Sequence, residues 1–341
     1  MPARSAPAAY ATKPPASAFA ILCAAAALFL ATALATPATA ATFTVDTTGD
    51  DVAKSACDDI AADDCSLRGA VAHANGDAAP DTIVVPAGTY TLSVASPCFF
   101  AAAAGDSVGG TPVVAICLNS NLDIVGASLN ETIIQSNGAD RIFAVSNTKT
   151  VTISGVTLSG GRNGFGFQIG GGGAINNHGT LTLSDSLVTN NQLVNQSGGG
   201  LHNFGTLAVI RSTITGNSTS SGSGGGISNT CCPGNFVVPV ITLTVIDSTI
   251  SNNGAQNGGG IATTRIANVI GSTIDGNIAT SGGGIYHGGD QLAVLNSTIS
   301  GNTGLGGGIG PIGNLLRLES STITKNHGIP YGGGFYSSNN R

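Results

Sequence analysis

The sequence of 341 residues contains no tryptophan, one methionine and few charged residues, which make up 9% of the chain. Low charge combined with 41% hydrophobic residues excludes an intrinsically disordered chain, which has low hydrophobicity and high net charge. Lys and Arg number 12 against 18 acidic residues, so the basic surface typical of nucleic-acid-binding proteins is missing and no nucleic-acid partner is expected. With five tyrosines and no tryptophan, the chain also offers few rings for a sugar-stacking cleft.

Glycine, by contrast, is abundant, with 51 residues, of which 42 lie from residue 151 onward. Each interior glycine costs a helix roughly 1 kcal/mol relative to alanine, which excludes a largely helical protein. Collagen requires glycine at about every third position throughout, whereas the glycines here form clusters. The composition therefore predicts a chain rich in β-strands and turns.

The first 40 residues have the character of an export signal. Arg4 and Lys13 precede an apolar run over 17–35, and Ala38-Thr39-Ala40 forms an A-x-A cleavage site. The run is near the length needed to span a bilayer, so an uncleaved anchor is the alternative. The small-residue site favours cleavage before Ala41. We therefore expect a Sec-exported protein, periplasmic, extracellular or at the cell surface, with no transmembrane span in the mature chain.

Six cysteines remain after this segment, an even number that suggests disulfides in an exported protein. Proximity favours two pairs that each close a short loop, Cys57–Cys65 and Cys98–Cys117. Cys231 and Cys232 are adjacent, and they either form a strained vicinal bond or stay free. Because no C-x-x-C spacing occurs and the five histidines are scattered, these residues predict no metal site.

An internal repeat is the decisive feature of the sequence. A triple glycine followed by an apolar residue recurs at steps of 24 to 27 residues, with one step of 34 that holds a loop insertion around residues 231–234. The clusters end at Gly173, Gly200, Gly226, Gly260, Gly284, Gly308 and Gly334. Between them a six-residue motif begins with serine, carries an aliphatic residue at its third position and ends with asparagine. The asparagines are Asn191, Asn217, Asn253, Asn277, Asn302 and Asn326.

Each repeat contains about three short stretches in which apolar and polar residues alternate, a pattern typical of strands with one buried face. A unit this short cannot bury its apolar face alone, so units stacked about 4.8 Å apart must pair their strands. The repeat predicts an all-β fold, a single-stranded right-handed parallel β-helix of the pectin-lyase-like type. We expect the asparagines to form an internal amide ladder and the glycines to occupy corners. The expected inward column is Val188, Ile214, Ile250, Ile274, Ile299 and Ile323.

The remainder of the mature chain divides into a cap over 41–81, irregular first coils over 82–160 and regular repeats over 161–341. In the cap, apolar residues at 67, 70, 71 and 74 predict an amphipathic helix with Asp64 as its N-cap. Such a helix covers the open apolar end of a solenoid. No comparable cap follows the last repeat. An open end exposes strand edges, so we expect end-to-end self-association there, a covering partner, or a fragment of a longer protein.

The cap and repeats resemble a known group, the secreted bacterial CSLREA-domain proteins with right-handed β-helix repeats. The motif reads Cys65-Ser66-Leu67-Arg68-Gly69-Ala70, with Gly69 in place of the usual glutamate. The repeats also resemble those of chlamydial polymorphic outer-membrane proteins, with GGAI intact at 172–175 and FxxN replaced by Ile-x-x-Asn, as at 214–217. The resemblance implies a surface-associated, adhesin-like protein that presents an extended binding face to an extracellular glycan or to a host or cell-surface ligand.

The main alternative function is a polysaccharide lyase or glycoside hydrolase of the pectin-lyase-like fold. A hydrolase needs two carboxylates at a defined separation, yet only five acidic residues lie from residue 151 onward. In stacked coils Asp185, Arg211 and Asp247 fall in one column, about 4.8 Å apart per step, and are the candidate catalytic residues. The same column is typical of a turn that adopts the left-handed region, which is the interpretation we favour.

Half of the acidic residues lie between residues 46 and 81. Because calcium prefers hard oxygen ligands, Asp50, Asp51, Asp58 and Asp59 are candidate calcium ligands. Their spacing does not match a calcium-binding loop, and a solvating acidic loop is the favoured interpretation. No other cofactor is expected.

Threonine pairs flank the inward column, such as Thr213 and Thr215, and form the T-x-T array that ice-binding solenoids present. Threonine also suits any strand surface, and Asp275 interrupts the array, so ice binding is a minor alternative. His178, His202 and His287 fall at different offsets from their glycine clusters. They are therefore expected to be exposed turn residues that do not stack as ligands.

Overall fold

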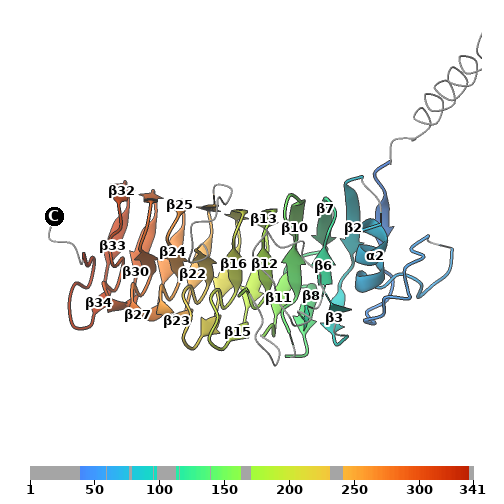
Figure 1. The fold of residues 1–341 in the computed structure, drawn as a ribbon, viewed down its shortest axis with the longest axis horizontal. Helices are drawn as coiled ribbons and strands as arrows, with labels where there is room; N and C mark the ends of the chain where they lie inside the picture. The colour runs from blue at the N-terminus through green and yellow to red at the C-terminus, as the bar shows by residue number, and fades with distance from the viewer. Residues whose placement is uncertain are drawn as a thin grey trace, which may run out of the picture. The chain divides into compact units, whose positions relative to one another are not determined.

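The computed structural model describes residues 39–58, 60–76, 79–94, 96–97, 113–114, 116–138, 140–162, 170–230 and 241–337. This part of the chain is almost wholly β-structure and has a single short helix, α2 (Leu67–Ala74). Its strands stack coil upon coil into a right-handed parallel β-helix of about eight turns, with α2 at one end and the last repeat at the other (Figure 1). The fold predicted from the repeat is confirmed.

Of the expected export segment, residues 1–38 lie outside the described residues. Among the helices that are described, none has both the length and the apolar character to cross a membrane.

Two long parallel sheets run along the solenoid, each taking one strand from successive coils. The ten-stranded sheet contains β1 (Thr42–Thr44), β2 (Asp81–Val85), β7 (Leu122–Gly126), β10 (Thr150–Ser154), β13 (Thr180–Ser184), β17 (Thr206–Ile210), β21 (Thr242–Ile246), β25 (Ile266–Ile270), β29 (Gln291–Leu295) and β32 (Leu315–Glu319). The nine-stranded sheet contains β3 (Gly88–Leu92), β8 (Thr132–Ser136), β11 (Thr157–Ser159), β14 (Leu187–Thr189), β18 (Thr213–Thr215), β22 (Thr249–Ser251), β26 (Thr273–Asp275), β30 (Thr298–Ser300) and β33 (Thr322–Thr324).

Two shorter parallel sheets take strands from fewer of the coils. The seven-stranded sheet contains β6 (Ile116–Leu118), β9 (Phe143–Val145), β12 (Ile175–Asn177), β16 (Leu201–Asn203), β20 (Ile227–Asn229), β24 (Ile261–Thr263) and β28 (Ile285–His287). The six-stranded sheet contains β15 (Gln192–Leu193), β19 (Ser218–Thr219), β23 (Gly254–Asn257), β27 (Ile278–Ser281), β31 (Thr303–Leu305) and β34 (His327–Gly328). An antiparallel pair, β4 (Ser96–Pro97) and β5 (Val113–Val114), stands apart.

A regular coil thus holds four strands, whereas the sequence pattern predicted about three. The additional strands are those of the six-stranded sheet, which are two to four residues long and share no alternation of apolar and polar residues. Their pairing is set by the coils on either side, so a pattern within one repeat does not predict them.

The core follows the expected inward column. Val188, Ile214, Ile250, Ile274 and Ile299 have no exposed surface, and Ile323 in the last coil is partly exposed. Complete burial of one such side chain contributes about 1.5–3 kcal/mol. Parallel columns from the ten- and seven-stranded sheets face it and form one continuous apolar core.

Strand pairing also explains the glycine clusters. Ile175 pairs with Leu201, which is 26 residues further along the chain. The first two glycine clusters end 27 residues apart, at Gly173 and Gly200, because Ala174 occupies the position that the third glycine has in the next coil. Gly198, the first glycine of the next cluster, has a φ of +74°. A β-carbon there would lie 2.4 Å from the carbonyl oxygen of Leu201. The corner therefore requires glycine for both conformation and space.

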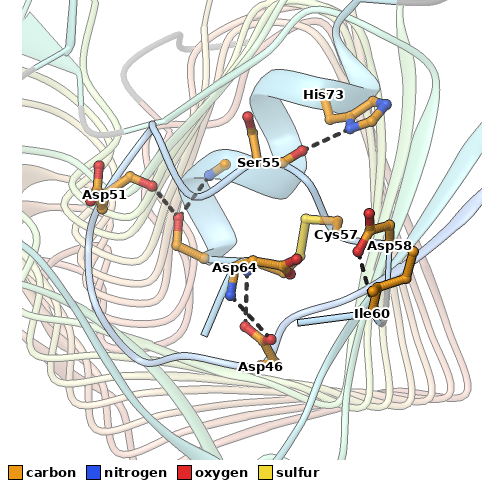
Figure 2. The surroundings of a disulfide bond; sticks show 11 residues. Asp46, Asp51, Ser55, Cys57, Asp58, Ile60, Asp64 and His73 are labelled. Carbon is orange, nitrogen blue, oxygen red and sulfur yellow. Dashed lines mark hydrogen bonds between the residues drawn. A yellow bond between two sulfur atoms is a disulfide. The ribbon is translucent and has the colours of Figure 1, made fainter. Parts of the chain in front are cut away.

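The helix α2 covers the first coil with the four apolar residues that the sequence identified. Its N-cap is Ser66, whose hydroxyl oxygen accepts a hydrogen bond from the peptide nitrogen of Gly69 at 2.9 Å, so the prediction of Asp64 is wrong. Asp64 instead donates its peptide N–H to the carboxylate of Asp46, as does Cys65 (Figure 2). Because a cap must lie directly before the first helical turn, a start at Leu67 leaves that role to Ser66.

The disulfide between Cys57 and Cys65 is present, as the sequence suggested (Figure 2). Cys117 is disulfide-bonded. Its expected partner Cys98 lies outside the described residues, as do Cys231 and Cys232.

Candidate functional site

The candidate catalytic column lies on the outer surface, at the turn between the ten- and nine-stranded sheets. Arg211 donates two hydrogen bonds to the carboxylate of Asp185, at 2.7 and 2.6 Å. Both side chains are about half exposed. The hydrogen bond from Arg211 lowers the pKa of Asp185, and the same pairing raises the pKa of Arg211. The pair is therefore a charged, solvated ladder in which each group already has its partner.

Backbone conformation identifies this column as a turn. Asp185, Arg211 and Asp247 have φ of 49°, 46° and 48°, and their counterparts in the next coils share the left-handed region. These counterparts are Gly271, Asn296 and Ser320. Left-handed positions favour glycine, asparagine and aspartate whatever their chemistry. The three candidate catalytic residues thus share a turn position whose left-handed backbone conformation accounts for their residue types.

The candidate calcium ligands do not converge. The carboxylate of Asp50 is turned into the cap, where Arg68 donates to it at 2.6 and 3.1 Å and the peptide nitrogens of Ser93 and Val94 donate at 2.6 and 2.7 Å. Burial by itself raises the pKa of Asp50, but these hydrogen bonds outweigh burial and hold the pKa below its usual value. Both oxygens of Asp50 thus stabilise the cap.

Asp51 and Asp58 each accept a hydrogen bond from the peptide nitrogen two residues further along, which closes a local turn. Asp59 lies outside the described residues. Among the residues that the structure describes, no three histidine, cysteine, aspartate or glutamate side chains are grouped so as to hold a metal ion.

A buried polar cluster lies at the corner that precedes the seven-stranded sheet. Arg141 donates to the carbonyl oxygens of Gly170 and Gly171, each at 2.8 Å, and its guanidinium lies 3.9 Å from the carboxylate of Asp140. Gly171 donates its peptide N–H to Nδ1 of His202 at 3.0 Å. A corner of the first regular coil is therefore held between an arginine and a histidine from its two neighbouring coils.

The cluster continues through two rings. Phe204 stacks on His178, with ring centroids 4.8 Å apart, and contacts His202 at 4.1 Å. His202 and His287 are buried within β16 and β28, so the prediction that they are exposed turn residues is wrong, whereas His178 is partly exposed and lies just after β12. Strand register explains the ring contact of His178, because Asn177 pairs with Asn203 and this places His178 directly beside Phe204 in the next coil.

Burial shifts the pKa of each titratable group in the cluster. It raises the pKa of Asp140 to about 6, against the lowering effect of Arg141. Burial, with the charge of Arg141, lowers the pKa of His178 to about 4. Burial, with His178 and Arg141, lowers the pKa of His202 to about 3. Both imidazoles are therefore neutral near pH 7, and because Nδ1 of His202 accepts a hydrogen bond, its proton lies on Nε2.

Several polar atoms of this cluster have no hydrogen-bond partner among the described residues. They are Oδ2 of Asp140, Nε of Arg141, Oδ1 of Asn176 and Nε2 of His202. All four side chains are more than nine-tenths buried. Strongly shifted pKa values at buried groups are typical of functional sites, although ion-pair networks produce them as well. The sequence carried a partial signal for this cluster in the adjacent Asp140 and Arg141.

Polar ladders follow the corners of the coil. In the asparagine column, Nδ2 of each amide donates to Oδ1 of the next, at 2.9–3.1 Å. A serine ladder, which the sequence analysis missed, runs parallel to it, and each serine peptide nitrogen donates to the hydroxyl of the next coil at 3.0–3.2 Å. The serines are Ser186, Ser212, Ser248, Ser272, Ser297 and Ser321. These ladders pair the buried polar atoms of the corners.

The outer face of the nine-stranded sheet carries a column of identical residues. Thr213, Thr249, Thr273, Thr298 and Thr322 lie in register on five successive coils. They are partly exposed or, in the last coil, exposed. None of their hydroxyls has a hydrogen-bond partner within the part of the chain that the structure describes. In the neighbouring column, Ser251 donates to Thr215 at 3.1 Å and Ser300 to Asp275 at 2.6 Å.

Comparison with known proteins finds only distant likenesses among solved structures. No protein-family model and no curated protein sequence matches the chain. Among solved structures it is similar to two A-modules of Azotobacter vinelandii, those of the mannuronan C-5 epimerases AlgE4 and AlgE6. Each is 15% identical to this chain, with TM-scores of 0.31 and 0.33. The matches cover 80% and 81% of this chain and 95% of each neighbour.

Proposed function

We propose that the protein is an exported β-helix of the cell surface or the surrounding medium, whose outer face binds an extended polymer, most simply an extracellular glycan. The observation that carries this proposal is the threonine column of the nine-stranded sheet, Thr213 to Thr322. It repeats one hydroxyl at every coil, about 4.8 Å apart. A polymer whose units each carry hydroxyl groups and a ring oxygen can form the same hydrogen bond with a threonine hydroxyl at successive coils.

The proposal is tested by glycan-array screening, followed by calorimetric titration of the glycans that bind. Thr249→Val and Thr273→Val together remove two hydroxyls from the centre of the column and keep the shape and strand preference of the side chains. We expect at least a tenfold loss of affinity. Thr152→Val and Thr182→Val make the same change on the outer face of the ten-stranded sheet and serve as the control. Equal losses in both pairs, or no glycan bound at all, would overturn the proposal.

Ice binding uses the same column, so the same variants separate the two functions. Thermal hysteresis in the unmodified protein that disappears in the Thr249→Val, Thr273→Val variant would replace the glycan assignment by ice. In the neighbouring column of the same face, Asp275 accepts a hydrogen bond from Ser300. The carboxylate of Asp275 places a negative charge on this face. Its partial exposure at the centre of the array favours a hydrated polar ligand.

The buried cluster of Asp140, Arg141, His178 and His202 favours a second candidate, a polysaccharide lyase or hydrolase. A carboxyl group that titrates near pH 6, beside a buried arginine, is of the kind that transfers protons in catalysis. Turnover of pectate, alginate and related glycans tests it, with His202→Gln expected to abolish product formation and Asp185→Asn to preserve it. Absence of turnover in the unmodified protein would remove this candidate.

A further inference from the structure

The coil farthest from α2 differs from all others in its exposure. Leu318 is 38% exposed, and Phe335 is 41% exposed. The residues beside them one coil earlier, Val294 and Ile309, have no exposed surface. Each of β32, β33 and β34 has only one strand neighbour among the described residues. This end of the solenoid is therefore an apolar surface bordered by strand edges whose N–H and C=O groups face outward.

The opposite end is closed. The helix α2 covers the first coil, and the ion pair of Arg68 and Asp50 ties the cap to the segment after β3. At that end β1 is the outer strand of the ten-stranded sheet, but α2 covers the core, so among the described residues the apolar end that a second copy offers is the same one that the first copy offers. Two identical edges meet only across a two-fold axis, which closes the assembly at two copies.

A two-fold axis through β32 reverses the strand direction, so the two β32 strands pair antiparallel. Charge decides the register. Centring the axis on Arg317 opposes two arginines, which is unfavourable for directly opposite positions. Centring it on Leu318 places Arg317 opposite Glu319 of the second copy, twice, and brings the two half-exposed Leu318 side chains together on the core side. The charges of β32 are thus self-complementary in one register.

We propose that the protein forms a closed dimer in which the β32 strands of two copies pair antiparallel about Leu318. The pairing extends the ten-stranded sheet continuously through both copies. Within one chain Arg317 already lies 2.6 Å from Glu319, so the dimer joins two such pairs into a four-charge ladder across the axis. It also covers the exposed end of the core at Leu316 and Leu318.

Light scattering and sedimentation of the purified protein across a range of concentrations test the dimer. We expect twice the mass of the chain. Arg317→Glu and Glu319→Arg, made singly, place like charges opposite one another and are expected to weaken association at least tenfold. The double variant exchanges the two charges and is expected to restore it. Arg211→Glu, which breaks a comparable exposed pair on a central coil, is the control and leaves the dimer intact.

Three results would overturn the proposal. They are a monomer at every concentration, an open-ended series of larger assemblies, and a dimer that survives both single variants. Leu318→Lys provides a second route, because in the proposed register it places two ammonium groups on the axis without altering Arg317 or Glu319. Circular dichroism of each variant verifies that the β-helix is folded.

Discussion

The carbonyl oxygen of Lys54 lies against the α-carbon of Gly69, where an added β-carbon would be only 1.8 Å away. The same carbonyl accepts a hydrogen bond from the peptide nitrogen of Ser66 at 3.0 Å, so the segment before the disulfide is held directly against the first turn of α2. This contact gives a physical reason for glycine at position 69. A glutamate at position 69 has no room unless the Lys54 segment moves.

Gly69→Ala is therefore expected to destabilise the protein. In an exposed helix the change would stabilise by about 1 kcal/mol, but here the steric overlap reverses the sign. We expect a net loss of about 2–4 kcal/mol, as for other overpacked sites. Chemical denaturation followed by far-ultraviolet circular dichroism measures it.

Ala72→Gly in the same helix is the matched control for this prediction. Ala72 is exposed, so removing its methyl group is expected to cost about 1 kcal/mol through helix propensity alone. A Gly69→Ala variant as stable as the unmodified protein would contradict the close contact with Lys54.

The asparagine ladder predicts the cost of a single buried amide. Asn253 is 1% exposed, accepts from the peptide nitrogen and side chain of Asn217, and donates to the carbonyl oxygen of Ile214 and to Asn277. Asn253→Ala removes one partner from each of four buried polar atoms, of which Nδ2 of Asn217 still donates to Val188 and Thr215 and Oδ1 of Asn277 still accepts from the peptide nitrogen of residue 253. Each unpaired atom costs about 1–3 kcal/mol, and partial repair by water reduces the sum. We expect a loss of about 3–5 kcal/mol in thermal or chemical unfolding.

Asn268→Ala is the control for the ladder. Asn268 lies on the outer face of β25 and is partly exposed, so its loss is expected to change stability by less than about 0.5 kcal/mol. Equal effects of the two substitutions would contradict the role of the ladder in holding neighbouring coils together.

These residues show why so much of the fold is predictable from the sequence. In a solenoid each side chain meets its counterpart one repeat away, so recurrence along the chain predicts contact in space. The column of Val188 to Ile323, the asparagine ladder and the glycine corners all follow from that rule. Ser66 as the N-cap does not, because the choice between Asp64 and Ser66 depends on where the first helical turn begins.

The candidate site shows the opposite case. The contact of His202 with Gly171 and of Arg141 with Gly170 joins residues from different coils whose types do not recur. Their alignment depends on Ala174 replacing a glycine, which shifts the visible repeat by one residue. A periodic pattern in the sequence predicts the contacts that recur in every coil. A site confined to two or three coils can be located only when the strand register between those coils is known.

The buried cluster predicts the dependence of stability on pH. His178 and His202 have folded pKa values of about 4 and about 3, below the unfolded value of about 6.5. Their contribution is therefore present above pH 6.5 and is lost as the pH falls, because the unfolded chain binds two protons that the folded chain does not. Asp140 acts in the opposite sense, because its folded pKa of about 6 lies above the unfolded value. As the pH falls, the folded chain therefore binds a proton at Asp140 before the unfolded chain does.

Within this cluster the net difference between pH 6 and pH 4 is thus one proton, which lowers the free energy of unfolding by about 1.4 kcal/mol per unit as the pH falls. Burial also lowers the pKa of His287, so that residue adds to the fall. Asp140→Asn removes the opposing group, so the contribution of the cluster steepens to about 2.8 kcal/mol per pH unit. Urea denaturation at half-unit pH intervals measures both slopes. Asp185→Asn, at an exposed position, is expected to leave the slope unchanged in this range, and parallel curves for all three proteins would contradict the shifts at the cluster.

Two opposing contributions to stability meet at Arg211, an unfavourable backbone conformation and a favourable ion pair. Its left-handed backbone, with φ of 46°, costs a residue with a β-carbon about 1 kcal/mol. Its exposed ion pair with Asp185 returns at most a similar amount. Arg211→Gly removes both, and the greater freedom of glycine in the unfolded chain costs about 0.4–1 kcal/mol. We expect a melting temperature within about 2 °C of the unmodified protein.

Arg211→Val tests the same position with a side chain that the left-handed region disfavours most. A β-branched residue is a genuine outlier there, so we expect a loss of about 1–2 kcal/mol relative to Arg211→Gly although both variants lack the ion pair. Calorimetric unfolding of the two variants side by side isolates the backbone contribution. If the glycine variant were the less stable of the two, the ion pair could not be the reason, and the left-handed turn would have to be abandoned as the feature that selects residues in this column.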